Sequence, residues 1–178
     1  MVMASQGICI LAGGRSLRMG RDKARLRVGG RTLLGHVRRT AESLGLDVRV
    51  IRRDLVTRCG PLGGIYTGLK TSMHTAELFL SCDMPFVTAG LLKRMMRAEC
   101  PIFVEHDREV GFPLMLSVAD VDIVENEIRA GRFSLQNLAR RLKAKRLRVR
   151  ARETRRLLNV NTPAEWEEAR RRRAELPL

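Results

Sequence analysis

A short stretch near the N-terminus combines two glycines with positive charge in the order that phosphate binding requires. An apolar run ends there in a series of small and then basic residues: Leu11, Ala12, Gly13, Gly14, Arg15, Arg18 and Lys23. Glycine has no Cβ, so the backbone N–H groups of Gly13 and Gly14 can come close to an anion. The basic side chains add positive charge, and a guanidinium can hold phosphate oxygens with two hydrogen bonds. The pattern predicts a phosphate-binding loop that suits a triphosphate better than a neutral ligand.

A carboxylate follows a second apolar run. Residues 78–82 have the composition of a buried strand, and Asp83 comes directly after them. Magnesium is commonly held by one or two carboxylates together with phosphate oxygens of the substrate. We therefore expect Asp83 to be a Mg²⁺ ligand opposite the glycine loop, although an aspartate before Met84 and Pro85 could also cap a turn.

The glycine loop matches neither of the two common nucleotide fingerprints, and a glycine pair alone is also typical of a plain turn. The whole string from 11 to 23, Leu-Ala-Gly-Gly-x-Ser-x-Arg-Met-Gly-x-Asp-Lys, resembles the signature loop of the molybdenum cofactor guanylyltransferases. Three more segments resemble the same family in the same order. They are Gly-Pro-Leu-Gly-Gly at 60–64, Cys-Asp-Met-Pro at 82–85 and Asn-Val-Asn-Thr-Pro at 159–163.

This resemblance implies an activity and a set of site residues. The activity is the transfer of GMP from GTP to the phosphate of the molybdopterin cofactor, with release of pyrophosphate and with Mg²⁺ as cofactor. The family pattern places the nucleotide on Leu11, Ala12, Gly13, Gly14, Lys23, Asp54 and Asp83. It assigns catalytic roles to Arg18, Lys23 and Asp83, the metal to Asp83, and the pterin to Asn159 and Asn161.

One departure from the family leaves the substrate open. A strand and an asparagine-bearing loop usually lie between the first helix and the Asp54 segment, whereas here about nine residues separate Leu44 from Asp54. A guanine-contacting asparagine is not evident. A nucleotidyltransferase for another nucleotide or another phosphorylated substrate therefore remains an alternative, as does a basic nucleotide- or RNA-binding module without turnover.

Length and composition indicate one domain, residues 1–178. The 178 residues are 44% hydrophobic, which is enough for one compact core. No apolar run reaches the length of a membrane span, and the first seven residues do not resemble a secretory signal, so we expect a cytoplasmic protein. We interpret the four widely spaced cysteines as reduced structural thiols. We expect a monomer.

The chain is strongly basic, with a formal net charge of +15. Residues 140–156 carry ten lysines or arginines against the single acid Glu153. Such charge can bind nucleic acid. However, the chain has only one Trp, one Tyr and five Phe, and none lies among these arginines, so stacking platforms are scarce. We favour a solvated face that can also steer polyanionic substrates, GTP and molybdopterin, and we expect no nucleic acid partner.

These residues have to be positioned by alternating strands and helices. The sequence predicts strands at 7–11, 47–52, 78–82, 102–105, 112–117 and 147–149. It predicts helices that begin after Thr32, at Pro61, after Thr88, at Ala119 and Ser134 and after Thr162, with ends near 44, 73, 98 and 130 for the first four. This alternation indicates a three-layer α/β/α fold with a mostly parallel, Rossmann-like sheet, and the resemblance implies the nucleotide-diphospho-sugar transferase type.

Overall fold

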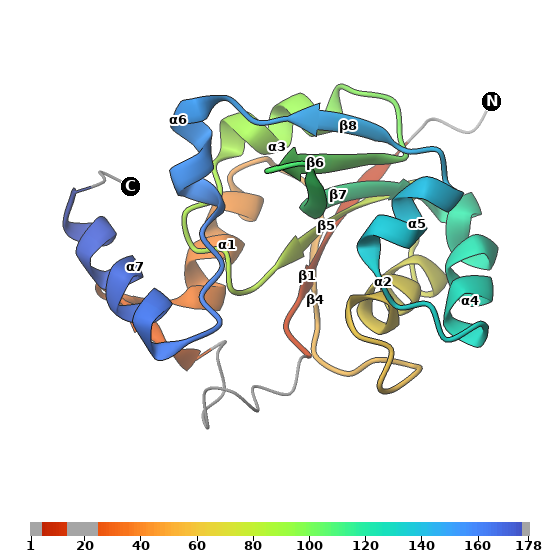
Figure 1. The fold of residues 1–178 in the computed structure, drawn as a ribbon, viewed down its shortest axis with the longest axis horizontal. Coiled ribbons are helices and arrows are strands. Elements are labelled where there is room, and N and C mark those ends of the chain that lie inside the picture. Colours follow the sequence, from red (N-terminus) through yellow and green to blue (C-terminus); the bar gives the residue numbers. More distant parts are fainter. Residues whose placement is uncertain (1–4, 14–24, 176–178) are drawn as a thin grey trace.

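The computed structural model describes residues 5–13 and 25–175, and its centre is a six-stranded sheet (Figure 1). The strand order is β4 (Val48–Ile51), β1 (Gln6–Leu11), β5 (Ala76–Ser81), β7 (Glu109–Ser117), β6 (Ile102–His106) and β8 (Lys145–Arg148). Strand β7 runs antiparallel to β5 and β6, and the other paired strands are parallel. The expected α/β class with a mostly parallel sheet is confirmed.

Helices cover both faces of this sheet and give the predicted three layers (Figure 1). One face packs against α1 (Leu33–Glu42) and α3 (Ala89–Met96), and the other against α2 (Pro61–Lys70), α4 (Val121–Arg129) and α5 (Leu135–Arg141). Side chains alternate along β1, so Ile8 and Ile10 enter the first core while Cys9 enters the second. A parallel strand that is buried on both faces has to be apolar throughout, which is why 7–11 is a continuous apolar run.

A third, smaller core joins segments from opposite ends of the sequence. It contains side chains from the hairpin β2 (Arg27–Val28) and β3 (Arg31–Thr32) and from the C-terminal helix α7 (Pro163–Glu175). The indole N–H of Trp166 donates to the carbonyl oxygen of Arg27 at 2.9 Å. Between β8 and α7 lie α6 (Ala151–Thr154) and the 3-10 turn η3 (Arg155–Leu157). The sequence predicted neither the hairpin nor α6.

The predicted helix starts after Thr32, Thr88 and Ser134 are confirmed, because each of these hydroxyls accepts a backbone N–H of the first turn. Helix α2 ends at Lys70, three residues before the predicted end, with Thr71 as its C-cap. The predicted helix from Ala119 starts instead as the 3-10 turn η2 (Val118–Asp120), which Ser117 and Asp120 cap reciprocally.

The last strand also differs from the prediction. Strand β8 covers Lys145–Arg148 rather than 147–149, because it pairs with β6 from Ile102 onwards and the N–H of Lys145 donates to the carbonyl of Pro101. In the part of the chain that the structure describes, no helix is long and apolar enough to span a membrane.

Candidate functional site

The end of β1 is held between its two neighbouring strands. The N–H of Ala12 donates to the carbonyl of Ile51 in β4 at 2.8 Å, and the carbonyl of Leu11 accepts the N–H of Cys82 after β5 at 3.1 Å. The residues that follow β4, β1 and β5 therefore lie side by side. We call this region the carboxyl edge of the sheet, the place where open α/β sheets bind their ligands.

Gly13 is packed too closely against the β4 loop for any other residue. A Cβ on Gly13 would lie 2.9 Å from the carbonyl oxygen of Arg52 and 3.4 Å from Asp54 Oδ1. The absence of a side chain thus brings the Asp54 loop against the start of the glycine loop. Gly14, Arg15, Arg18 and Lys23 lie outside the described residues.

Asp54 lies against the first turn of α2. A Cβ on Gly63 in that turn would be 2.9 Å from Asp54 Oδ2, so this glycine also makes room for the carboxylate. Burial raises the pKa of the half-buried Asp54 carboxyl above its ordinary value. Among the described residues no cation pairs with this carboxylate, and a carboxylate that loses water without such a partner is typical of a binding site.

The Gly-Pro-Leu-Gly-Gly segment forms the N-terminal part of α2 and contacts the same edge. Gly60 precedes the helix at φ 55°, a conformation that favours glycine, and Pro61 takes the first helical position. The Leu11 side chain lies over Gly64, where a Cβ would be 3.1 Å from the leucine methyl carbons. The sequence analysis assigned no role to Gly63 and Gly64, although both follow Pro61 within the first turn of α2.

Asp83 is held by its own strand and by a segment from the far end of the chain. The hydroxyl of Ser81 donates to Asp83 Oδ1 at 2.6 Å, which orients the carboxylate. The carbonyl oxygen of Asp83 accepts the N–H of Val160 at 2.9 Å. This backbone bond brings the Asn159–Asn161 loop to the carboxyl edge beside Asp83, and sequence reasoning missed both Ser81 and this contact.

The loop that carries the two asparagines is itself fixed by the capping box that follows it. The N–H groups of Asn161 and Thr162 donate to Glu165 Oε2 at 2.7 Å and 2.8 Å, and Thr162 Oγ1 accepts the N–H of Glu165. These reciprocal bonds form a capping box, and the predicted helix start after Thr162 is confirmed. Asn159 is exposed and Asn161 is half-buried, and Glu165 binds the backbone of this loop rather than either amide side chain.

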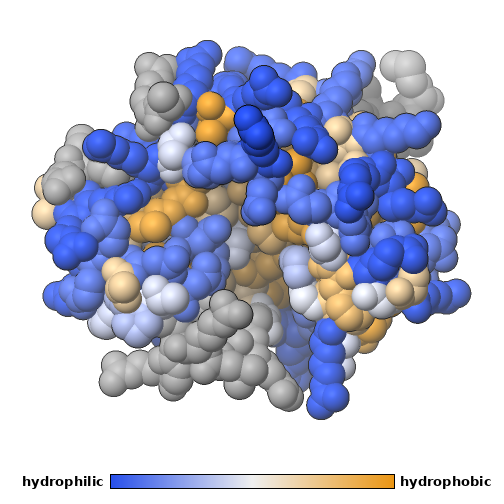
Figure 2. All heavy atoms as spheres, in the orientation of Figure 1, coloured by the Kyte–Doolittle hydropathy of each residue, from blue (hydrophilic) through white to orange (hydrophobic). Residues whose placement is uncertain are grey.

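Figure 2 shows a hollow on this face of the molecule, with hydrophobic atoms in its floor. It lies between the part formed by α6 and α7 and the part formed by α4 and α5, as comparison with Figure 1 shows. Its rim is mostly hydrophilic. Ligand sites in proteins are commonly hollows of this kind, apolar inside and with polar groups around them.

The oxygen donors described at the carboxyl edge fit a divalent metal such as magnesium. Among the described residues, no three His, Cys, Asp or Glu side chains come together in a group that could hold an ion by themselves. Structural zinc sites need such a group, whereas Mg²⁺ is usually held by one or two carboxylates, water and substrate phosphates. The carboxylate of Asp83, oriented by Ser81, is an oxygen donor of this kind.

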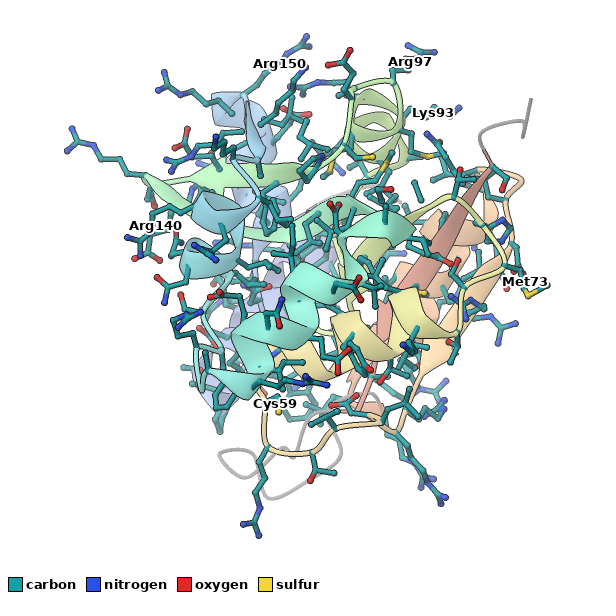
Figure 3. The ribbon with its side chains drawn as sticks, turned by 90° about the vertical axis from the view of Figure 1, so that its right-hand side faces the viewer. Cys59, Met73, Lys93, Arg97, Arg140 and Arg150 are labelled. Carbon is teal, nitrogen blue, oxygen red and sulfur yellow. The ribbon has the colours of Figure 1, made fainter. Side chains whose placement is uncertain are left out.

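Several basic residues of the 140–156 segment are paired with acids on neighbouring elements. Arg146 and Arg148 both bind Glu105, Arg141 lies 3.4 Å from Glu127, and Lys145 binds Glu99. Arg140 and Arg150 lie at the surface and point outward (Figure 3). The segment thus resembles a solvated edge with local ion pairs more than one continuous groove for a nucleic acid strand.

Comparison with known proteins gives a family match over most of the chain. The sequence model of the "MobA-like NTP transferase domain" matches residues 8–149. The molybdenum cofactor guanylyltransferase of Pseudomonas fluorescens is 34% identical over 180 aligned residues, covering 88% of this chain and 89% of that protein.

Solved structures show the same fold. The molybdopterin-guanine dinucleotide biosynthesis protein A of Archaeoglobus fulgidus superposes with a TM-score of 0.76 at 21% identity, covering 96% of this chain and all of that one. The 2-C-methyl-D-erythritol 4-phosphate cytidylyltransferase of Thermus thermophilus superposes with a TM-score of 0.69 at 18% identity, covering 97% of this chain and 100% of that one. Proteins with this fold are therefore named for different nucleotides, guanine in the first case and cytidine in the second.

Proposed function

Because this chain belongs to the MobA-like NTP transferase family, we propose that it transfers GMP from GTP to the phosphate of a molybdopterin cofactor and releases pyrophosphate. The observation that supports this most is a chain of contacts among the four family segments. Leu11 lies over Gly64, the Leu11 carbonyl accepts the N–H of Cys82, and the Asp83 carbonyl accepts the N–H of Val160. Segments from the whole sequence thus meet at one edge of the sheet.

The proposed reaction is the attack of a phosphate oxygen of the acceptor on the α-phosphorus of GTP. A bond forms between that oxygen and the α-phosphorus, and the bond from the α-phosphorus to the bridging oxygen of pyrophosphate breaks. A phosphate monoester is largely dianionic at neutral pH, since its second pKa is about 6. No general base is required, so the work of the protein is positioning and neutralisation of charge.

The described residues can divide this work between them. The backbone N–H groups from Gly13 onwards would hold phosphate oxygens, and Asp54 would contact the nucleotide from the β4 loop. Asn159 and Asn161 would donate and accept hydrogen bonds with the pterin, whose ring nitrogens and amide need both. In the glycine loop, Arg18 and Lys23 would stabilise the departing pyrophosphate, as the sequence predicts.

Nucleotidyltransferases typically use a divalent metal, and we propose Mg²⁺ here. Asp83 would hold it, with the Ser81 hydroxyl fixing the direction of the carboxylate. Bound there, the ion would neutralise negative charge on the phosphates.

The test is pyrophosphate release from GTP, CTP, ATP and UTP with purified molybdopterin and Mg²⁺, together with the affinity of each nucleotide. We expect GTP to bind most tightly and to be the only efficient substrate. Between α1 and Asp54 the chain has only β4, without the asparagine-bearing loop that usually lies there in the family. This test therefore bears most directly on the choice of guanine. Equal turnover of all four nucleotides would refute guanine selectivity, and tight binding of nucleotide or RNA without pyrophosphate release would favour the non-catalytic alternative.

A further inference from the structure

A second concave site lies beside α1, at the start of α3 and next to η3 and α7. Its volume is about 280 Å³. Four arginines from three separate parts of the chain line it together with a buried histidine and the N-cap of α3: Arg31, His36, Arg39, Thr88, Arg156 and Arg173. We call it the cationic pocket. None of the residues assigned to nucleotide, metal or pterin lines it.

The described residues supply no acidic partner to three of the four pocket arginines. No aspartate or glutamate is among the described residues that line it. Arg31, Arg39 and Arg156 make no ion pair with any residue that the structure describes. By contrast, Arg38, which precedes Arg39 on α1 and lies outside the pocket, pairs with Glu42 at 2.7 Å. Like charges around one hollow repel one another, and an anion would relieve that repulsion.

The buried His36 lies close enough to three of the pocket arginines for their charge to affect its pKa. Its side chain is only 7% exposed, and its Nε2 lies 2.7 Å from the carbonyl oxygen of Val28, so Nε2 has to donate the hydrogen. Burial lowers the pKa of His36, and the charges of Arg31, Arg173 and Arg39 lower it further, against the backbone bond to Val28. Arg31 before α1, Arg39 in α1 and Arg173 in α7 therefore all lie near His36.

The first turn of α3 adds donors to the same wall. Thr88 caps the helix by accepting the N–H of Leu91 at 3.3 Å, and Ala89 lines the pocket. The N-terminal N–H groups of a helix carry a partial positive charge and favour anions. Gly90 has open space where a Cβ would be, so a ligand can approach this turn.

We propose that the cationic pocket binds a small ligand through a phosphate or diphosphate group, at a site that contains none of the residues assigned to the nucleotide, the metal or the pterin. Four guanidiniums suit phosphate oxygens, which they can hold with paired hydrogen bonds. The volume lies just below the range of roughly 300 to 1,000 Å³ that pockets for drug-sized ligands occupy. It therefore suits a phosphoryl or diphosphoryl group better than a whole nucleotide. The proposal does not depend on the proposed reaction.

The probes are inorganic phosphate and pyrophosphate, titrated calorimetrically at constant ionic strength so that screening does not change. The Lys23→Ala variant serves as the background, because it weakens anion binding at the glycine loop. We expect each probe still to bind this variant at one site. Tighter binding of pyrophosphate would identify a diphosphate as the preferred group, and equal or tighter binding of phosphate would identify a single phosphoryl group.

Two double variants then locate that site. Arg31→Gln with Arg39→Gln should weaken binding about tenfold or more, since one hydrogen bond to a charged group is worth that much. Glutamine keeps the Cγ of Arg31, which packs against Gly35. The matched control, Arg38→Gln with Arg129→Gln, removes the same charge from exposed, acid-paired positions and should leave the affinity within about twofold.

Three results would overturn the proposal. One is loss of all anion binding in the Lys23→Ala variant with the arginines intact. Another is an unchanged affinity after substitution of Arg31 and Arg39. The third is an equal loss in the control pair, which would indicate general attraction to a basic surface. Melting curves of each variant establish that it is folded. Because the readout is anion binding and not turnover, an inactive protein would refute the proposed reaction and leave this test intact.

Discussion

Replacing Gly13 by alanine should damage the nucleotide site by moving two loops apart. The added Cβ would lie 2.9 Å from the Arg52 carbonyl oxygen, whereas ordinary contact begins at 3.4 Å, so the loops have to separate by about half an ångström. They cannot do so freely, because the adjacent Ala12 N–H is bonded to the Ile51 carbonyl at 2.8 Å. Overpacking of this kind costs about 1–3 kcal/mol of unfolding free energy.

The effect on nucleotide binding follows from the same displacement. A shift of about 1 Å can cost roughly 100-fold in a positioned reaction, so half of that should cost about tenfold in GTP affinity or turnover. Urea unfolding measures the stability, and calorimetry with GTP and Mg²⁺ measures the affinity. Gly30→Ala is the matched control, because a Cβ there meets nothing within 4 Å. A Gly13→Ala protein that binds GTP as tightly as the parent would refute the argument that this close approach builds the site.

Three further predictions concern carboxylates. Asp83→Asn keeps the shape but removes the charge, so pyrophosphate release should fall about 100-fold or more while the melting temperature stays unchanged; a near-normal rate would mean that this carboxylate only caps a turn. Burial raises the pKa of Asp54, so the folded chain holds the carboxyl proton more tightly than the unfolded chain does. The folded chain therefore loses stability as the pH rises from the ordinary pKa of 3.8 through the raised pKa. Asp54→Asn should therefore make unfolding in urea harder at pH 7 but not below the ordinary pKa of 3.8, and an equal gain at both pH values would contradict this. Glu77 is fully buried and bound to the part-exposed Arg49 at 2.7 Å, so Glu77→Ala should cost about 3 kcal/mol in the same assay; a cost no larger than the roughly 0–1 kcal/mol expected for the exposed Glu42→Ala would show that burial adds nothing.

Local signals made much of the fold predictable. Thr32, Thr88 and Ser134 mark helix starts because a capping hydroxyl acts within its own turn. Strand β8 was misplaced because its limits depend on pairing with β6, more than forty residues earlier in the chain. The β2–β3 hairpin was missed because strands of two residues show no period, and its stability comes from packing against α7.

In the candidate site, too, features that depend on local sequence could be predicted and contacts between distant segments could not. The positions of Gly13 and Asp83 could be predicted because each follows an apolar run that ends at one edge of a parallel sheet, while their roles stay predictions. The contact of Asp83 with Val160 could not, since it joins residues far apart in sequence through backbone atoms alone. The cationic pocket was equally hidden, because Arg31, Arg156 and Arg173 lie far apart in the sequence and come together only in the folded chain.

The core shared by the β2–β3 hairpin and α7 determines which parts of the protein can fold first during synthesis. Arg27 and Trp166, whose hydrogen bond closes this core, are 139 residues apart. At typical elongation rates the ribosome needs roughly ten to thirty seconds to add that length of chain. Throughout this interval the hairpin has no C-terminal partner, and the Asp83 loop lacks its bond to Val160. A nascent chain can therefore pair strands β1, β4, β5, β6 and β7 before the Asp83 loop gains its bond to Val160, and the site is completed only when the C-terminal segment has been made.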